Sequence, residues 1–323
     1  MTHILLIDGN HLGYASMYSS ALGSLQHEGF PTGGMIGLIQ SVIRISARFP
    51  RAVPVVLWDG HAAWRKELCP EYKENRQDKP EKVAVSESWH RQQPHAAHLL
   101  LQMGVLQLRA PEAEADDLAG ILTRDPSSFR DFGIGRITLV SGDTDWWQAL
   151  SDRVDWFNPI TDKSVTLADL QTEAVKHGPF SGTDEYLLAK AIAGDISDNI
   201  PGVPGVGITT AREFLQRFGG LDGIAEAVAS GAVTGKRAAA IVEHRETIER
   251  NRRIMDWRLA PLPNGGFSYV RLSFEPDACQ ELCSTFGLQR LSSRLGPEGE
   301  WSRLLREHRE GIASVVDFVE SRA

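Results

Sequence analysis

Acidic side chains gather at a few places in this sequence where they could bind metal ions. Besides Asp8 and Asp59, three short segments carry two or more acids: Glu114-Ala115-Asp116-Asp117, Asp143-Thr144-Asp145 and Asp195-Ile196-Ser197-Asp198. Several ionised carboxylates cannot share a site unaided, because like charges repel and raise one another's pKa. Divalent cations remove this repulsion, and all-oxygen ligation suits Mg²⁺ or Mn²⁺ rather than Zn²⁺.

The chemistry that such a set supports is phosphodiester hydrolysis. Two divalent ions about 3.5–4 Å apart, held by shared carboxylates, activate a water and stabilise the charge that develops on the phosphate. The candidate ligands are Asp8, Asp59, Glu114, Asp116, Asp117, Asp143, Asp145, Asp195 and Asp198.

Taken one at a time, each acidic segment also has a purely structural explanation. Acids in the first turn of a helix complement the helix dipole, which would account for Glu114 to Asp117. Asp143 could cap a helix, and Asp195 and Asp198 could form turns. The metal-site hypothesis therefore depends on the segments meeting in space.

Other kinds of catalytic site find little support in the sequence. His95 and His98 are three residues apart, but no partner cluster accompanies them, so we interpret them as a surface pair. Neither a Ser-His-Asp arrangement nor a phosphate-binding Walker loop is visible in the sequence.

A basic segment and a glycine-rich loop could bind phosphates. Lys73 and Arg76 would share one face of a helix, where they could grip a scissile phosphate, although a solvated mixed-charge helix explains the same pattern.

The loop with Gly202, Gly205 and Gly207 runs into Thr209 and Thr210. Glycines ahead of a helix let backbone N–H groups approach a phosphate, which predicts binding that is independent of base sequence. The alternative is a tight turn between helices. Farther on, residues 236–258 are rich in Lys and Arg and could track a duplex.

The elements that must position these residues alternate between strands and helices. Apolar runs at Ile4–Ile7, Val53–Trp58, Val105–Leu108 and Ile137–Val140 predict buried parallel strands. Helical spacing occurs over Met35–Ala47, His98–Met103 and Asp116–Thr123. Three of the four strands stop at or next to a carboxylate, at the sheet edge where ligands bind in α/β folds.

The second part of the chain differs from the first in its residue composition and in its hydrophobic pattern. Residues 194–207 are dense in Gly, Pro and Asp, and helical patterns follow at Thr210–Phe218 and Gly235–Arg253. We expect an all-helical region here, a linker at 260–270 and a weakly helical tail.

Composition limits the class of protein. The 323 residues, 42% hydrophobic and 24% charged, suit about two globular domains and exclude a collagen-like or disordered chain. Since no apolar run reaches about 18 residues and no secretory signal is visible, we expect neither a membrane anchor nor export. Three cysteines without CxxC spacing favour the reducing cytoplasm. A net charge of −8 argues against a nucleic-acid partner, unless metal ions neutralise the acids counted in it.

The ordered motifs of residues 4–290 resemble the flap endonuclease and 5′→3′ exonuclease family, in its bacterial and phage branch. These motifs are Leu6-Ile7-Asp8-Gly9, Trp58-Asp59-Gly60, the segment 70–76 (Pro-Glu-Tyr-Lys-Glu-Asn-Arg), Glu114-Ala115-Asp116-Asp117, Ser141-Gly142-Asp143-Thr144-Asp145 and the segment 194–207 from Gly194-Asp195 to Val206-Gly207.

The resemblance implies a PIN-like α/β nuclease core over residues 1–180, with a helical arch or clamp at about 62–95. A helix–three-turn–helix duplex-binding element would lie in 181–260, and 261–323 would be an extension packed on the core. By match, Asp8, Asp59, Glu114, Asp116 and Asp117 would serve mainly the first metal, Asp143 both, and Asp145, Asp195 and Asp198 the second. Tyr72, Lys73 and Arg76 would contact DNA, with Lys73 and Arg76 steering the phosphate. The glycine loop of such proteins commonly also holds a monovalent cation such as K⁺.

Three positions depart from the pattern of the family. Ala15 and Thr209 stand where the branch often has Arg and Lys, and Glu112 replaces a common Gly. By the resemblance, the first two departures remove DNA contacts but no metal ligand.

The function that this resemblance implies is a metal-dependent 5′ nuclease acting on DNA, with RNA–DNA hybrids as a further substrate. We expect it to be a monomer in a bacterial or phage-infected cytoplasm. Two alternatives are a junction-binding protein without catalysis and a toxin-type RNA-cutting PIN enzyme. The full acidic set disfavours the first, and the chain length and residues 194–218 disfavour the second.

Overall fold

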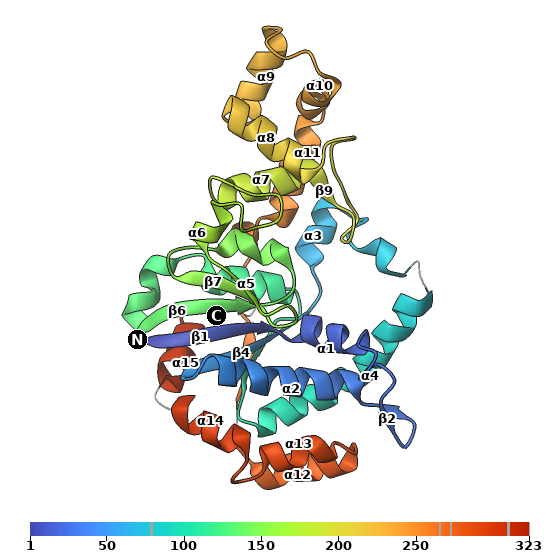
Figure 1. Cartoon of the computed structure of the whole chain (residues 1–323), viewed down its shortest axis with the longest axis vertical. Helices are drawn as coiled ribbons and strands as arrows, with labels where there is room; N and C mark the ends of the chain where they lie inside the picture. Colours follow the sequence, from blue (N-terminus) through green and yellow to red (C-terminus); the bar gives the residue numbers. More distant parts are fainter. Residues whose placement is uncertain (78–79, 265, 272, 309–310, 323) are drawn as a thin grey trace.

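The computed structural model describes residues 1–77, 80–264, 266–271, 273–308 and 311–322 (Figure 1). Its centre is a seven-stranded sheet with the order β11-β5-β4-β1-β6-β7-β8. The strands are β1 (Thr2–Asp8), β4 (Ala52–Trp58), β5 (Leu106–Arg109), β6 (Ile134–Val140), β7 (Val154–Asn158), β8 (Lys163–Val165) and β11 (Ser268–Val270). The five inner strands are parallel, and β8 and β11 pair antiparallel at the two edges. The expected α/β fold with a mostly parallel sheet is confirmed.

Helices cover both faces of this sheet because the side chains of each strand alternate between them. Along β1, Ile4 and Leu6 belong to one buried cluster, whereas Leu5 and Ile7 belong to the other. On the Leu5 side lie α1 (Gly9–Met17), α2 (Gly33–Arg48) and α4 (Pro80–Gln102). On the Ile4 side lie α5 (Ala115–Thr123), the 3₁₀ helices η2 (Pro126–Phe132) and η3 (Thr144–Ala149), and α15 (Ile312–Glu320). Smaller elements are β2 (Gln26–His27), β3 (Phe30–Pro31) and α6 (Leu167–Leu170).

The segment expected to form an arch leaves the sheet after β4. It consists of α3 (Ala63–Leu68), the 3₁₀ helix η1 (Glu74–Gln77) and the first half of α4, and it runs along the right side of Figure 1. Residues 78–79 between them lie outside the described part of the chain.

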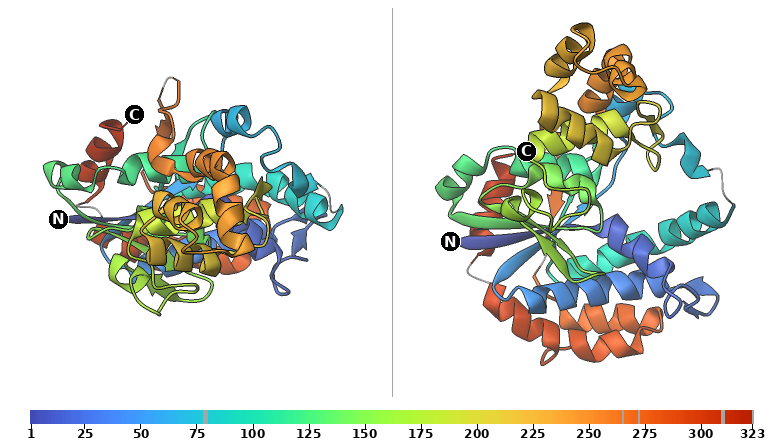
Figure 2. Two further views of the ribbon diagram at one scale, coloured as in Figure 1. Left: turned by 90° about the horizontal axis from the view of Figure 1, so that it is seen from above. Right: turned by 45° about the horizontal axis from the view of Figure 1, so that its top comes forward.

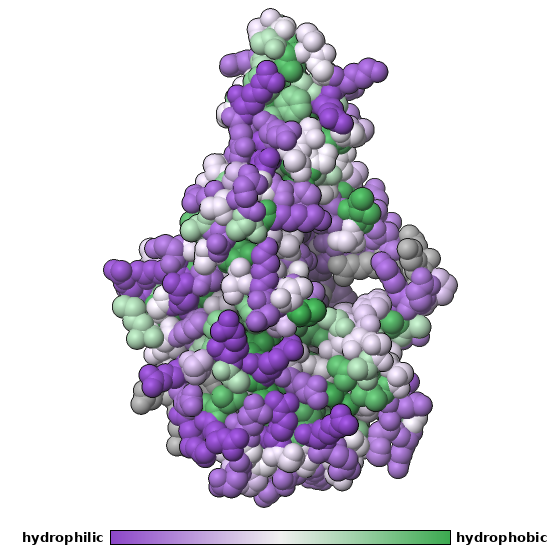
Figure 3. Space-filling model, viewed as in Figure 1, coloured by the Kyte–Doolittle hydropathy of each residue, from purple (hydrophilic) through white to green (hydrophobic). Residues whose placement is uncertain are grey.

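A helical region stands above the sheet in Figure 1 and in the right view of Figure 2, and it carries many hydrophilic side chains on the face in Figure 3. It contains α7 (Thr183–Ala193), β9 (Gly194–Asp195), β10 (Ile200–Pro201), α8 (Ile208–Phe218), α9 (Leu221–Ala229), α10 (Lys236–Glu243) and α11 (Arg245–Met255). The helical pattern predicted over 235–253 is divided between α10 and α11, which meet at His244.

The C-terminal segment returns to the sheet. After η4 (Trp257–Leu259), β11 pairs with β5, and α12 (Pro276–Thr285), α13 (Gln289–Leu295), α14 (Glu300–His308) and α15 follow. The prediction of a linker over 260–270 is therefore partly wrong, because Ser268–Val270 form a strand that pairs with the edge of β5. In the described part of the chain, we find no helix with the length and apolarity needed to cross a bilayer.

Candidate active site

The carboxyl end of β1 places Asp8 at the centre of the acidic site. Asp8 ends the strand and caps α1, accepting a hydrogen bond from the His11 N–H at 2.8 Å and another from Ser141 Oγ at 3.2 Å. Burial, with the nearby charges of Asp59 and Asp143, raises the pKa of Asp8 to about 8. Carboxylates that the chain separates by more than a hundred residues thus repel one another here.

Two further acids join Asp8 at this edge. Asp59, directly after β4, accepts hydrogen bonds from the Ala115 N–H at 2.8 Å and from Asn10 Nδ2 at 2.7 Å. Asp116, in the first turn of α5, accepts one from Trp146 Nε1 at 2.9 Å. Its pKa lies well above the ordinary value, first because it is buried and then because other carboxylates face it, those of Asp143, Glu114 and Asp8.

Asp143 links this group to a second one. It caps η3 and accepts the Asp145 N–H at 2.8 Å. Burial and the charges of Asp143 and Asp195 raise the pKa of Asp145 to about 7, although Lys190 opposes that shift. Lys190 Nζ hydrogen-bonds to Asp145 and lies 2.9 Å from Asp195 Oδ2, so one ammonium bridges two predicted ligands of the second metal.

A second lysine, in the segment between α3 and η1, contacts acids of both the core and the helical region. Lys73 Nζ lies 2.7 Å from Glu114 Oε1 and 3.9 Å from Asp198 Oδ2. Tyr72 Oη is 2.9 Å from Glu114 Oε2 and 3.2 Å from Asp198 Oδ2. Lys73 and Arg65 hold the pKa of Glu114 below its usual range against the effect of burial. Asp198, predicted to serve the second metal, therefore shares Lys73 and Tyr72 as partners with Glu114 of the first group.

Two predicted residues have positions that do not suit their predicted roles. Asp117 is fully buried, with both its oxygens within 2.8 Å of the Arg65 guanidinium, and it closes the capping box of α5. Its carboxylate serves the packing of α3 on α5 rather than the open site. Tyr72 is only 3% exposed, so it positions Lys73 and Glu114 instead of offering a free surface to DNA. The backbone of Arg76 lies in η1, but its side chain is outside the described part of the chain.

The glycine loop connects this edge to α8. Gly202 packs so closely on α7 that a Cβ atom there would lie 2.0 Å from the Ala193 carbonyl oxygen. Gly205 has a positive φ of 73°, which favours glycine, and Gly207 caps α8 with open space around it. Thr209 and Thr210 lie in the first turn of α8, with Thr209 Oγ1 2.8 Å from His177 Nδ1.

The donor set of this edge fits divalent cations in its chemistry. Within the described residues, no three His, Cys, Asp or Glu side chains are grouped closely enough to hold an ion as they stand. Lys73 and Lys190 instead neutralise the acids, each contacting two of them. Burial, and then repulsion from neighbouring carboxylates, raises the pKa values of Asp8 and Asp145, and Asp145 shares the ammonium group of Lys190 with Asp195. An oxygen-only site of this charge suits a doubly charged counterion.

Sequence reasoning missed Arg65 and Lys190. Lys190 is in the last turn of α7, five residues before Asp195, and Arg65 is one cation in a mixed-charge stretch. Neither position differs in sequence from a surface cation, so only the fold reveals their carboxylate partners.

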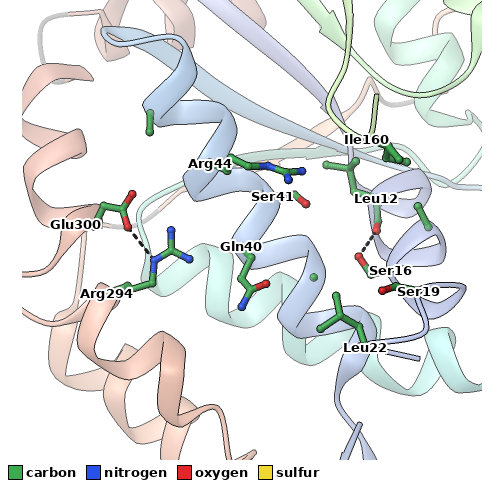
Figure 4. Close-up of a pocket in the computed structure, with 13 residues that line it drawn as sticks. Leu12, Ser16, Ser19, Leu22, Gln40, Ser41, Arg44, Ile160, Arg294 and Glu300 are labelled. Carbon is green, nitrogen blue, oxygen red and sulfur yellow. Dashed lines mark hydrogen bonds and ion pairs between the residues drawn. The ribbon is translucent and has the colours of Figure 1, made fainter. Parts of the chain in front are cut away.

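A separate hollow of about 480 Å³ between α1, α2 and α13 contains none of the predicted site residues (Figure 4). There Arg294 pairs with Glu300, and Ser16 donates to the Leu12 carbonyl.

Comparison with known proteins agrees with this geometry. Residues 3–177 match the family described as 5′-3′ exonuclease, N-terminal resolvase-like domain. The chain belongs to the 5′-3′ exonuclease family. Residues 183–261 match its companion, described as 5′-3′ exonuclease, C-terminal SAM fold. The expected family and its PIN-like, resolvase-like core are therefore confirmed.

Individual relatives are of two lengths. The thermostable DNA polymerase I of Thermus filiformis is 32% identical over 222 residues, which are 68% of this chain and 24% of that protein. A 5′-3′ exonuclease of Buchnera aphidicola is 27% identical over 224 residues, 68% of this chain and 72% of that protein. The chain thus spans about a quarter of the length of the polymerase relatives it matches.

Among solved structures, that of the bacteriophage T5 D15 protein co-crystallised with metal ions has a TM-score of 0.64 at 20% identity. The match covers 95% of this chain and 98% of that one, and it shows that the two share a fold. Another structure of the T5 protein is a pseudo-enzyme-product complex with DNA and metal ions, with a TM-score of 0.62 at 21% identity over 95% of this chain and 99% of that one.

Proposed function

We propose that this protein is a divalent-metal-dependent 5′→3′ exonuclease and 5′-flap endonuclease that hydrolyses DNA phosphodiesters. The observation that carries the proposal is the convergence of Asp8, Asp59, Asp116 and Asp143 at one sheet edge, with burial and mutual repulsion raising the pKa of Asp8 to about 8. A protein that only binds DNA gains nothing from repulsive carboxylates beside a polyanion. Family membership and the metal-bound T5 structures support the same activity.

We assign the acidic residues of the site to two divalent ions. Asp8, Asp59, Glu114, Asp116 and Asp143 would hold one divalent ion, and Asp143, Asp145, Asp195 and Asp198 another. Bound there, the ions supply a nucleophilic water and stabilise charge at the phosphate. Lys73, at the entrance of the arch, would orient the scissile phosphate together with Arg76. The glycine loop and the start of α8 would hold the duplex backbone.

The finer assignments belong to the same proposal. We propose Mg²⁺ or Mn²⁺ as the ions, because hard cations prefer oxygen ligands, and K⁺ at the glycine loop through its carbonyl groups. RNA in RNA–DNA hybrids would be a further substrate. We assign residues 1–180 to the nuclease core, 181–260 to duplex binding and 261–323 to an extension of the core. We propose a monomer in the cytoplasm, where its three free cysteines stay reduced.

A cleavage assay on three labelled DNAs tests the activity: a 5′ flap, a nicked duplex and a blunt duplex, each with Mg²⁺, with Mn²⁺ and with EDTA. We expect metal-dependent products at or near the 5′ end, and their sizes separate flap cleavage from end cleavage. Intact substrates under every metal condition would refute the proposal, and tight flap binding without turnover would instead favour a junction-binding protein.

The double variant Asp143→Asn/Asp145→Asn tests the assignment of the carboxylates. These side chains are not part of the apolar core, so the variant should fold with an unchanged circular dichroism spectrum while cleavage falls by at least about 10³-fold. Activity equal to that of the unchanged protein would refute the metal assignment.

A further inference from the structure

A pocket of about 330 Å³ lies beside the active site and reaches the start of α8. Its polar wall contains Thr144, Lys176, His177 and Lys190, and its aromatic side chains are Trp147 and Tyr186. None of the described residues that line it is acidic. In a protein of net charge −8, a pocket lined by two lysines and a histidine points to an anionic ligand.

The two lysines of this pocket are not equivalent. Lys190 already compensates Asp145 and Asp195. Lys176 is exposed, and among the described residues no carboxylate lies within 4.0 Å of its ammonium group. Lys176 is therefore the lysine of this pocket that has charge to offer a ligand.

The segment that carries Lys176 is fixed against α8. His177 has a positive φ of 68°, and its carbonyl accepts a hydrogen bond from Arg212 Nη1 at 2.7 Å. Its ring Nδ1 lies 2.8 Å from Thr209 Oγ1. Two contacts with α8 thus hold a backbone conformation that L-residues rarely adopt, and they keep Lys176 at the mouth of the pocket.

The pocket also borders the first turn of α8. Ile208 lines it, and Gly207, the N-cap residue of this 11-residue helix, has no side chain with which to cap the N–H groups of the first turn. Those groups and the helix dipole add to the attraction that the cations exert on an anion.

We propose that this pocket is a phosphate subsite that holds a backbone phosphate of the bound DNA between the metal site and α8, with Lys176 as its cation and the His177 ring as its hydrogen-bonding partner. The inference rests on the nuclease function proposed above and adds to it a contact from the segment between α6 and α7. The same chemistry would accept a free phosphate, such as the 5′-phosphate of a released mononucleotide, and the experiment separates the two sources.

The test measures the DNA affinity of the whole 323-residue chain across a range of salt concentrations. A labelled 5′-flap duplex is titrated in EDTA, in which we expect no cleavage, against the protein with and without Lys176→Ala. We expect Lys176→Ala to weaken Kd about fivefold at moderate salt. It should also reduce the slope of log Kd against log salt by about 1, the value for one lost phosphate contact. Lys176→Arg should restore both quantities.

Arg290→Ala is the matched control, because Arg290 is an exposed cation on α13, at the end of the molecule opposite α8 (Figure 1). It should change neither Kd nor the slope. An affinity and slope equal to those of the parent protein would overturn the proposal for DNA, and so would a weaker Kd with an unchanged slope, since a structural effect releases no counterions. Thermal unfolding checks that Lys176→Ala folds.

Titration with inorganic phosphate and with a deoxynucleoside 5′-monophosphate, each followed by NMR of the His177 ring, forms the second arm. Binding that Lys176→Ala abolishes, without any change in DNA affinity, would assign the pocket to product instead of backbone. No effect in either arm would refute the subsite. Failure of the nuclease proposal is distinguishable, because it shows as absent cleavage by the unchanged protein.

Discussion

Lys73 and Lys190 each contact two carboxylates that we assign to metal ions. These lysines act as monovalent counterions, and a divalent ion that enters the site must compete with them or displace them. Removing one ammonium should therefore make the fold depend more strongly on metal.

Lys190→Met tests this dependence. Without its ammonium, Asp145 and Asp195 face each other uncompensated in a largely buried site, so the free energy of unfolding in EDTA should fall by about 3 kcal/mol. Mg²⁺ should then raise the Tm of Lys190→Met by more than it raises that of the unchanged protein. Lys190→Arg keeps the charge and serves as the control. Equal Mg²⁺-induced shifts in Tm for all three proteins would contradict the argument.

The neighbours Asp116 and Asp117 make a second prediction at this scale. Asp117→Asn weakens a buried ion pair with Arg65, so it should lower the free energy of unfolding by about 3 kcal/mol while Mg²⁺ affinity persists. Asp116→Asn relieves repulsion and should preserve stability in EDTA, but it should weaken Mg²⁺ binding at least about tenfold. Calorimetry and chemical unfolding measure the two quantities. A similar loss of Mg²⁺ affinity in both variants would return Asp117 to the ligand set.

This contrast also marks what sequence reasoning can resolve. Spacing identifies Glu114 to Asp117 as an acidic helix start, and on α5 adjacent residues point in different directions. Which acid faces the open site depends on where Arg65 lies, and α3 brings Arg65 to Asp117 from a position 52 residues away.

At the scale of elements, the glycine loop depends on one close approach. Gly202→Ala would push a methyl group against the Ala193 carbonyl, so we expect a loss of about 3 kcal/mol in stability and weaker duplex binding. Gly207→Ala meets open space at an ordinary φ of −84° and should cost about 1 kcal/mol or less. Urea unfolding compares the two variants. Equal losses would mean that the loop does not pack on α7 as described.

The start of β1 makes stability depend on pH through His3. Burial, together with the charge of Arg136, lowers the pKa of His3 to about 4, and its ring contacts Thr138 and Phe49. The folded state therefore binds the proton less readily than the unfolded state, whose pKa is near 6.5. The contribution is complete above that value and is lost as the pH falls toward 4.

His3→Gln should remove this contribution. Between pH 7 and pH 4.5, the free energy of unfolding of the unchanged protein should fall by about 2 kcal/mol more than that of His3→Gln, as measured by urea unfolding at both values. Identical pH dependence in the two proteins would show that His3 does not stay neutral in the fold.

For the whole molecule, the N-terminal two-thirds of the chain was easier to predict than the last sixty residues. The strands that became β1, β4, β5 and β6 are continuous apolar runs, which appear in sequence because both faces of each strand are buried. The tail offers short amphipathic helices whose partners lie far away in sequence. Trp301, for example, donates to the Met103 carbonyl at 2.7 Å and is fully buried. No local pattern encodes that contact.

Such contacts predict that the C-terminal segment folds as one unit with the sheet. Trp301→Ala opens a cavity under α14 and should lower the free energy of unfolding by about 3–5 kcal/mol. Trp301→Phe keeps most of the packing but leaves the Met103 carbonyl without its donor, so it should lose about 1–3 kcal/mol. In both variants, we expect cleavage activity and far-UV circular dichroism to disappear together in one thermal transition, because α12, α13 and α14 share a buried cluster with α2 and α4. If the tail unfolded at a lower temperature while a metal-dependent nuclease persisted, residues 261–323 would be a separate appendage instead.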